Sequence, residues 1–161
     1  MSIADEAQVA LVLADIANED AAKKINMLGA GWYITGLGPT GFTPEQTIVV
    51  MIEVPSTYRG EQYAICLKLL DEAGAAVSFP GPSGEQTPLR IQQLVRVDPP
   101  IVAGTHIPPH VPSRNQILMR LPNGLPLSPN HVYRWVFEID GNDLASCSFY
   151  VAGAPPSPLL G

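Results

Sequence analysis

The chain has 161 residues, which is the usual size of one domain, and its net charge at pH 7 is −6. A hydrophobic content of 46% supplies ample apolar surface for a core, which argues against disorder, and the apolar run at residues 9–14 is far shorter than the roughly 20 residues of a membrane-spanning helix. The negative charge argues against nucleic acid as the main partner, because phosphate binding needs a concentrated basic surface.

The first stretch of the chain is ambiguous between strand and helix. Residues 9–14 suit a buried strand, although the alanines and leucines there also suit a helix, and we favour the strand. The polar segment 18–24 predicts a turn. Strands are then expected at 25–28 and 32–35, on either side of a kink at Gly29-Ala30-Gly31.

Later segments alternate apolar and polar residues with a period of two, which is typical of half-buried strands. One face of a strand carries Tyr63, Ile65, Leu67 and Leu69, and another carries Tyr133, Trp135, Phe137 and Ile139. Further strands are expected at 47–54, 90–97, 116–121 and 145–151, and turn residues separate them. The sequence therefore predicts an all-β fold, an antiparallel β-sandwich of immunoglobulin-like or similar type with long Pro-rich loops. Residues 1–152 would form one domain and residues 153–161 an extended Pro-rich tail.

None of the chemical motifs in the sequence is complete. Residues 36–41 match the letters GxGxxG, but a β-branched run follows where a dinucleotide site needs a helix. His106 and His110 have the i, i+4 spacing of a helical zinc site, but Pro108 and Pro109 between them prevent that helix. Residues 140–143 are explained by turn chemistry without calcium. We therefore expect no enzyme, no catalytic residue, no cofactor and no metal.

The two cysteines, Cys66 and Cys147, lie far apart in the sequence and have no metal-ligand spacing. They are expected to be buried free thiols, with a bridge between two facing strands left open. The acidic start of the chain is unlike a secretory signal, so synthesis in a cytoplasm is expected.

The start of the chain resembles a family of short proteins from bacteria and tailed phages. The resemblance rests on Ala14-Asp15-Ile16-Ala17 followed by Lys24-Ile25-Asn26-Met27-Leu28-Gly29-Ala30-Gly31-Trp32, in which Ala30 replaces the middle glycine of the family pattern. It covers about the first 35 residues specifically. It implies a β-sandwich without a recognised enzymatic activity, and it supplies no catalytic residues.

Charge and proline content divide the chain into two halves. Residues 1–80 hold ten acids and four bases, whereas residues 81–161 hold five of each, no lysine, and 13 of the 17 prolines. Arginine without lysine in apolar, Pro-rich loops is typical of protein interfaces, although codon usage in a GC-rich genome would produce the same bias. A surface with only 15% charged residues suits a protein held in a lattice better than a solitary one.

These features predict a structural protein of a tailed-phage virion, such as a capsid decoration or minor capsid protein. It would dock on the coat lattice through the Pro-rich segments 98–113, 122–129 and 155–161, with no membrane partner and with self-association possible. Small-ligand or glycan binding through Trp32, Tyr33, Tyr58 or Trp135 is the alternative. The candidate partner-binding residues are His106, Pro108, Pro109, His110, Arg114, Arg120, Leu125, Arg134, Pro156, Leu159 and Leu160.

Overall fold

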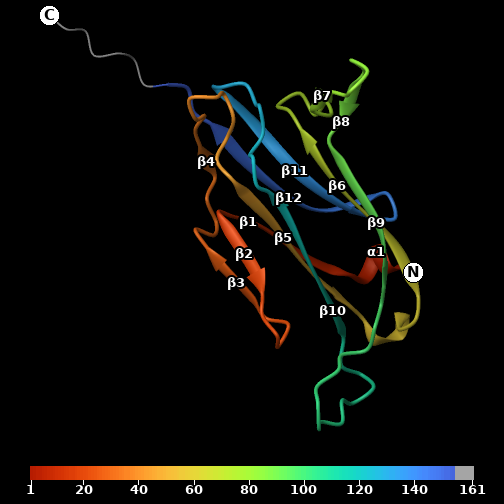
Figure 1. Cartoon of the computed structure of the whole chain (residues 1–161). Coiled ribbons are helices and arrows are strands. Elements are labelled where there is room, and N and C mark those ends of the chain that lie inside the picture. The colour runs from red at the N-terminus through yellow and green to blue at the C-terminus, as the bar shows by residue number, and fades with distance from the viewer. Residues whose placement is uncertain (155–161) are drawn as a thin grey trace, which may run out of the picture.

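The computed structural model describes residues 1–154, which consist almost entirely of strands and their connections (Figure 1). In chain order the elements are α1 (Ile3–Glu6), β1 (Gln8–Ala14), β2 (Ile16–Glu19), β3 (Ile25–Leu28), β4 (Ile34–Thr35), β5 (Gln46–Val54), a 3-10 turn (Ser56–Tyr58), β6 (Gln62–Leu70), β7 (Ser78–Pro80), β8 (Gln86–Pro88), β9 (Arg90–Arg96), β10 (Ser113–Leu121), β11 (His131–Ile139) and β12 (Asn142–Val151). Among these residues, no helix has the length and apolar content needed to cross a membrane.

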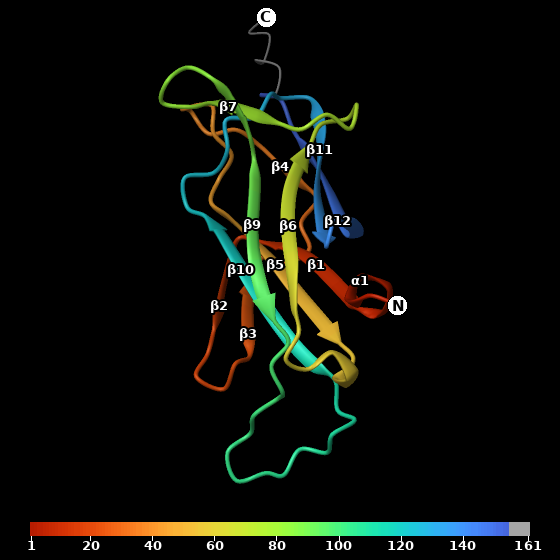
Figure 2. The same ribbon diagram turned by 90° about the vertical axis from the view of Figure 1, so that its right-hand side faces the viewer.

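Two sheets pack face to face and form an antiparallel β-sandwich, as predicted (Figures 1 and 2). One sheet has the strand order β1-β5-β10, and the other has the order β4-β12-β11-β6-β9. All pairings are antiparallel except that of the short β4 with the end of β12, which is parallel. Two small hairpins, β2–β3 and β7–β8, lie outside these sheets.

The period-two pattern marks the core faces correctly. Tyr63, Ile65, Leu67 and Leu69 on β6 are all buried, and so are Tyr133, Trp135, Phe137 and Ile139 on β11. The opposite sheet contributes Ile48, Val50, Ile52 and Val54 from β5 to the same cluster. Interdigitation of these two faces is the main source of stability, because it removes the most apolar surface from water.

The N-terminal region differs from the prediction in its details. Residues 3–6 form a short helix, in which Ile3 and Ala4 are buried against the core, whereas the strand favoured at 9–14 is confirmed as Gln8–Ala14. The segment 16–19 is the strand β2, so the predicted turn is shorter and centres on Asp20, whose carboxylate accepts hydrogen bonds from the backbone of Ala22 and Lys24. Strand β4 is limited to Ile34 and Thr35, because Gly29 and Gly31, both with positive φ, turn the chain just before it.

The β2–β3 hairpin packs on the outer face of the three-stranded sheet, against β5. Thr47 and Val49 alternate with core residues of β5 and therefore point outward, yet both are fully buried. Ala17 of the hairpin is buried as well. The hairpin thus covers one end of this sheet and leaves the other end open.

The two cysteines are free and point to opposite faces of the five-stranded sheet. Cys147 lies directly opposite the core residue Trp135 on the neighbouring strand and shares its face. Cys66 lies directly opposite Glu138, on the outer face of the sheet. The pleat therefore excludes the intramolecular bridge that the sequence left open.

Tyr58 ties the N-terminal helix to the 3-10 turn after β5. Its hydroxyl donates to the Glu6 carboxylate at 2.6 Å, and this hydrogen bond raises the pKa of Tyr58 to about 12; burial raises the pKa of Tyr63 to about 12 as well. A raised pKa favours the neutral phenol in the folded state. The hydrogen bond between Tyr58 and Glu6 therefore stabilises the folded protein fully below pH 10, the unfolded pKa of tyrosine. This contribution to the free energy of unfolding is lost as the pH rises through about 12.

Alkaline titration of tyrosine absorbance checks this assignment. We expect two of the five tyrosines to ionise near pH 12 in the folded protein. Glu6→Gln should bring Tyr58 back toward pH 10 and leave Tyr63 unchanged. An unchanged titration curve in the Glu6→Gln variant would contradict the assigned hydrogen bond.

Candidate docking surface

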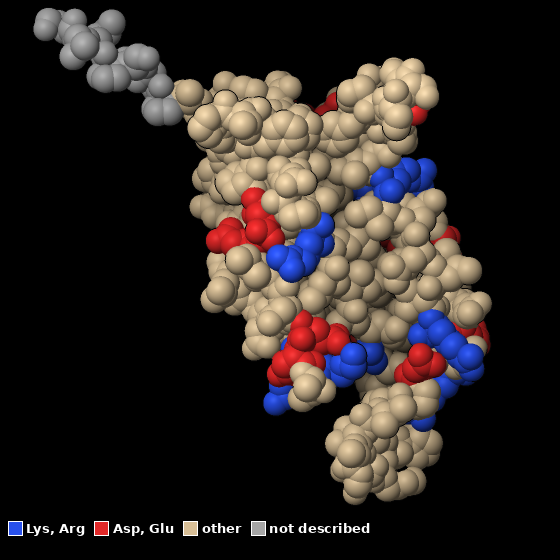
Figure 3. Space-filling view, in the orientation of Figure 1, with Lys and Arg blue, Asp and Glu red and all other residues tan. Residues whose placement is uncertain are grey.

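A long connection between β9 and β10, residues 97–112, projects from one end of the sandwich (Figures 1 and 2). Residues 99–112 contain no charged side chain, and Ile101 and Val102 expose 88% and 55% of their surface. Figure 3 shows the projection as an uncharged lobe, with acidic and basic groups gathered where it joins the body. Two large aliphatic side chains exposed to solvent on a projecting loop are typical of an interaction site.

The base of this docking loop is fixed by hydrogen bonds to the sandwich. Arg59 donates from Nη2 to the carbonyl of Val111 at 2.6 Å. Asn115 donates from its side chain to the carbonyl of Arg96 at 3.2 Å, and Arg96 approaches Asp98 at 3.6 Å. These contacts hold both ends of the loop in place.

Two turns shape the loop itself. The N–H of Thr105 donates to the carbonyl of Val102 at 3.1 Å, and the N–H of Val111 donates to the carbonyl of Pro108 at 3.2 Å. The loop is therefore folded before any partner binds, and its prolines reduce the entropy lost on docking.

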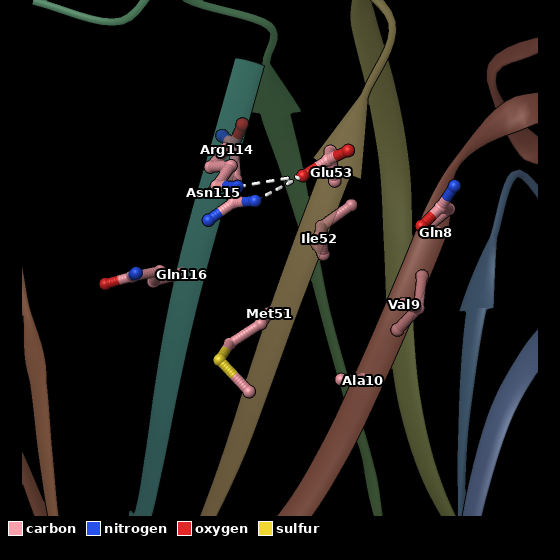
Figure 4. Close-up of a pocket in the computed structure, with 9 residues that line it drawn as sticks. All are labelled: Gln8, Val9, Ala10, Met51, Ile52, Glu53, Arg114, Asn115 and Gln116. Carbon is pink, nitrogen blue, oxygen red and sulfur yellow. Dashed lines mark hydrogen bonds and ion pairs between the residues drawn. The ribbon is translucent and has the colours of Figure 1, made fainter. Parts of the chain in front are cut away.

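A hollow of about 840 Å³ lies between the docking loop, β10 and the β2–β3 hairpin. Pro99, Ile101 and Pro112 supply apolar walls, and Lys23 and Asp98 lie at its rim. A second hollow of about 310 Å³ continues over the outer face of β1, β5 and β10 (Figure 4). The two share Arg114, Asn115 and Gln116 as lining residues, so they form one open trough beside the loop.

The structure gathers one group of the predicted residues on this surface. His106, Pro108, Pro109 and His110 are all exposed on the docking loop. Arg114 lies at its base and forms an ion pair of 2.8 Å with Glu53, its direct cross-strand neighbour (Figure 4).

Other predicted residues lie elsewhere. Arg120 is near the far end of β10 and pairs with Glu45 at 2.9 Å. Arg134 is exposed on the outer face of β11 in the opposite sheet. The residues that were expected to form one contact surface are therefore spread over three regions. Pro156, Leu159 and Leu160 lie outside the described residues.

The expectation for Leu125 requires correction. Its side chain is only 6% exposed and belongs to the core, as does Leu127. The N–H of Thr43 donates to the Leu125 carbonyl at 2.9 Å, and the N–H of Leu125 donates to the Thr43 hydroxyl at 2.9 Å. These bonds draw the 122–129 loop inward, so the side chain of Leu125 is not available to a partner.

Sequence reasoning missed Ile101 and Val102 as individual contact residues, although it selected the segment that holds them. The signal is present in the sequence: an aliphatic pair follows two prolines in a stretch of 14 residues, 99–112, without a charge. Lys23 and Glu19, which line the hollow from the hairpin, have no comparable signal, because only the folded chain brings them there.

The aromatic residues considered for glycan binding are mostly engaged in packing. Trp135 is fully buried, as the sequence predicted, and Trp32 packs edge-on against Phe149 with a ring separation of 5.6 Å. Tyr58 is bound to Glu6. Tyr33 remains well exposed, but a lone ring is a poor platform for a sugar.

An ionic cluster on the outer face of the five-stranded sheet is balanced in charge. Lys68 donates to Glu138, which is largely buried, and to Asp143 at 3.1 Å, while Arg90 lies 3.9 Å from Glu138. The hydrogen bond to Glu138 raises the pKa of Lys68. Two cations facing two carboxylates form a structural ion-pair network. Within residues 1–154, no group of three His, Cys, Asp or Glu side chains could hold a metal ion.

Comparisons with known proteins concern the fold alone. No protein-family model matches this sequence, and no curated protein matches it. An immunoglobulin-like protein from Pseudomonas aeruginosa is similar in structure with 13% identity and a TM-score of 0.45, over 93% of this chain and 99% of that one. An alkylpurine DNA glycosylase from Pseudomonas fluorescens, bound to DNA containing an abasic-site analogue, shows 9% identity and a TM-score of 0.41 over 92% of this chain. This chain spans only 31% of the glycosylase. The assignment of an antiparallel β-sandwich rests on the strand pairing of the chain itself.

Proposed function

We propose that this protein is a non-enzymatic interaction protein that docks through residues 97–112. More specifically, we propose that it is an accessory protein of a tailed-phage virion, either a capsid decoration protein or a minor capsid protein, and that it binds the coat lattice. The observation that carries the interaction role is the absence of charge from residues 99–112 of the docking loop, together with the exposure of Ile101 and Val102 on it. The virion assignment rests on the resemblance of the first 35 residues and on the low charged fraction.

Two physical features support docking by this loop. Burial of the exposed aliphatic side chains would gain about 25 cal/mol for each Å² of apolar surface removed from water. The conformational entropy lost on binding is small, because Arg59 and Asn115 fix the base of the docking loop and two turns hold the rest of it. Binding would therefore depend little on salt, in contrast to an interface held by exposed ion pairs.

Co-sedimentation with purified phage particles, from a phage whose genome encodes this chain, tests the proposal. The double variant Ile101→Asp, Val102→Asp should lose binding by at least tenfold, because it places two charges on the uncharged loop. Tyr33→Asp is the matched control, since Tyr33 is 68% exposed on a different part of the surface, and it should bind normally. Both variants should keep the unfolding temperature of the parent, because all three side chains are exposed in the free protein.

The outcomes separate the two levels of the proposal. Absence of the protein from purified particles would overturn the virion assignment. Equal binding of the loop variant and the parent would overturn the role of the docking loop.

A further inference from the structure

Within residues 1–154, strand β9 forms an open edge of the five-stranded sheet, because β6 is its partner on one side and the sheet ends on the other (Figure 2). Gln92, Gln93 and Leu94 in its middle are all exposed, and Leu94 exposes 69% of its surface. The strand has seven residues and contains neither proline nor lysine, the residues that commonly block such edges.

The hydrogen-bond pattern shows which backbone groups of β9 are free. Just beyond its two ends, Leu69 N–H donates to the Leu89 carbonyl at 3.3 Å, and Val97 N–H donates to the Glu61 carbonyl at 2.9 Å. Antiparallel strands alternate, so odd-numbered residues of β9 bond to β6 and even-numbered residues point away from it. The Arg96 carbonyl follows this rule, because it accepts from Asn115 rather than from β6. The N–H and C=O groups of Gln92 and Leu94 therefore face the open edge.

The charges on β9 indicate what kind of strand can pair with it. The strand begins with Arg90 and ends with Arg96, and it has no acidic residue. Each arginine has a distant acidic neighbour, Glu138 at 3.9 Å and Asp98 at 3.6 Å, compared with 2.8 Å for the Arg114–Glu53 pair. Arg90 also donates from Nη2 to the Cys66 sulfur at 3.6 Å, but each guanidinium has five N–H donors and keeps some of them for a closer carboxylate.

Pairing of two copies of β9 over the whole length of the strand is unfavourable. An antiparallel pair of two copies centred on Gln93 would place Arg90 of each copy directly opposite Arg96 of the other. Like charges in directly opposed positions destabilise a strand pair. We therefore take a segment of another protein as the occupant, and the test below distinguishes it from a second copy of this chain.

We propose that β9 accepts an extended segment of a partner protein as an additional strand, and that this segment carries carboxylates opposite Arg90 and Arg96 with uncharged residues between them. Main-chain hydrogen bonds to Gln92 and Leu94 supply affinity, and the two arginines supply specificity. The proposal is independent of the docking loop and of the virion assignment.

Synthetic seven-residue peptides test the proposal directly. The probe is a fluorescein-labelled peptide Glu-Thr-Val-Thr-Val-Thr-Glu, and the matched control replaces both glutamates by lysine. We expect the glutamate peptide to bind at least tenfold more tightly by fluorescence anisotropy. Its binding should protect the backbone amides of Gln92 and Leu94 from hydrogen exchange and leave the docking loop unaffected.

Two variants of β9 separate the backbone from the charges. Leu94→Pro removes an outward N–H without touching the bonds to β6, so it should abolish binding of both peptides while the protein stays folded. Arg96→Glu keeps the edge and should reverse the preference at that end, so that the glutamate peptide loses at least tenfold in affinity. If Leu94→Pro does not fold, the Arg96→Glu comparison still decides the question.

Three results would overturn the proposal. They are equal affinity for the two peptides, exchange protection that misses Gln92 and Leu94, and a dimer of the parent protein in solution that Leu94→Pro converts to a monomer. The last result would identify a second copy as the occupant. Loss of virion binding in the docking-loop variant, by contrast, would leave the peptide results unchanged.

Discussion

Replacement of Trp135 by alanine is expected to lower the free energy of unfolding by about 3–5 kcal/mol, the range for a large aromatic side chain removed from a core. Trp135 is fully buried at the centre of β11 and belongs to the cluster that joins the two sheets. The indole N–H has no hydrogen-bond partner among residues 1–154, so its contribution comes from packing. The cavity left by alanine would lie between two rigid sheets that can close it only in part.

Chemical denaturation followed by circular dichroism measures this effect. Trp32→Ala is the matched control, because Trp32 is only partly buried and packs on Phe149 at the edge of the cluster, and its loss should be clearly smaller. Trp135→Phe should recover much of the stability, since a ring refills most of the space. An unchanged denaturation midpoint in Trp135→Ala would show that this face of β11 is not the core.

Gly124→Ala is expected to cost about 2–5 kcal/mol, from two sources that act together. Gly124 has a φ of +63°, which strains an L-residue such as alanine by about 1–2 kcal/mol. A Cβ atom would also lie 1.8 Å from the backbone carbonyl oxygen of Thr43, and relief of such an overlap typically costs about 1–3 kcal/mol. The 122–129 loop must therefore move away from Thr43, and the buried Leu125 moves with it.

Gly104→Ala separates these two sources. Gly104 has a similar φ of +73°, but no atom lies within 4 Å of the position of its Cβ. Its substitution should cost only the backbone strain, about 1–2 kcal/mol. Thermal unfolding of both variants measures the difference, and equal losses would show that the contact between Gly124 and Thr43 is not tight.

The strands of the core were predictable because burial on one face imposes a period of two. The pattern in 63–69 and 133–139 identified β6 and β11 and their inward faces, and the β-branched run after Gln46 identified β5. A one-residue shift would expose a whole face, so the hydrophobic pattern determines the register strongly. The same reasoning placed the hairpin turn at Asp140-Gly141 between β11 and β12.

Local pattern did not show how the elements combine. The short helix at Ile3–Glu6 depends on the burial of Ile3 against strands distant in sequence, which no local pattern reports. Leu125 was assigned to the surface because prolines and a glycine surround it, whereas its burial follows from bonds to Thr43, 82 residues away. Arg114, Arg120 and Arg134 were all candidate anchors, with Arg120 and Arg134 equally compatible with the outer faces of strands, and only the sheet order places Arg114 and Arg134 in different layers.

The candidate site was predictable as a segment but not as a surface. Prolines and the absence of charge selected residues 98–113. The contribution of Lys23 from the hairpin and the orientation of the free edge of β9 both follow from strand order and pairing. Neither the position of Lys23 nor the free edge of β9 could be predicted from residues that are close in sequence.

The docking loop joins the last strand of one sheet to the edge strand of the other, which has a mechanical consequence. A load applied to the loop passes into β9 and β10 together, along the axes of both strands. Their hydrogen bonds to β6 and β5 lie perpendicular to that direction, so the ladders are loaded in shear and many bonds must break at once. An attachment at this point would resist pulling far better than one at a chain terminus, where a single strand can peel away bond by bond.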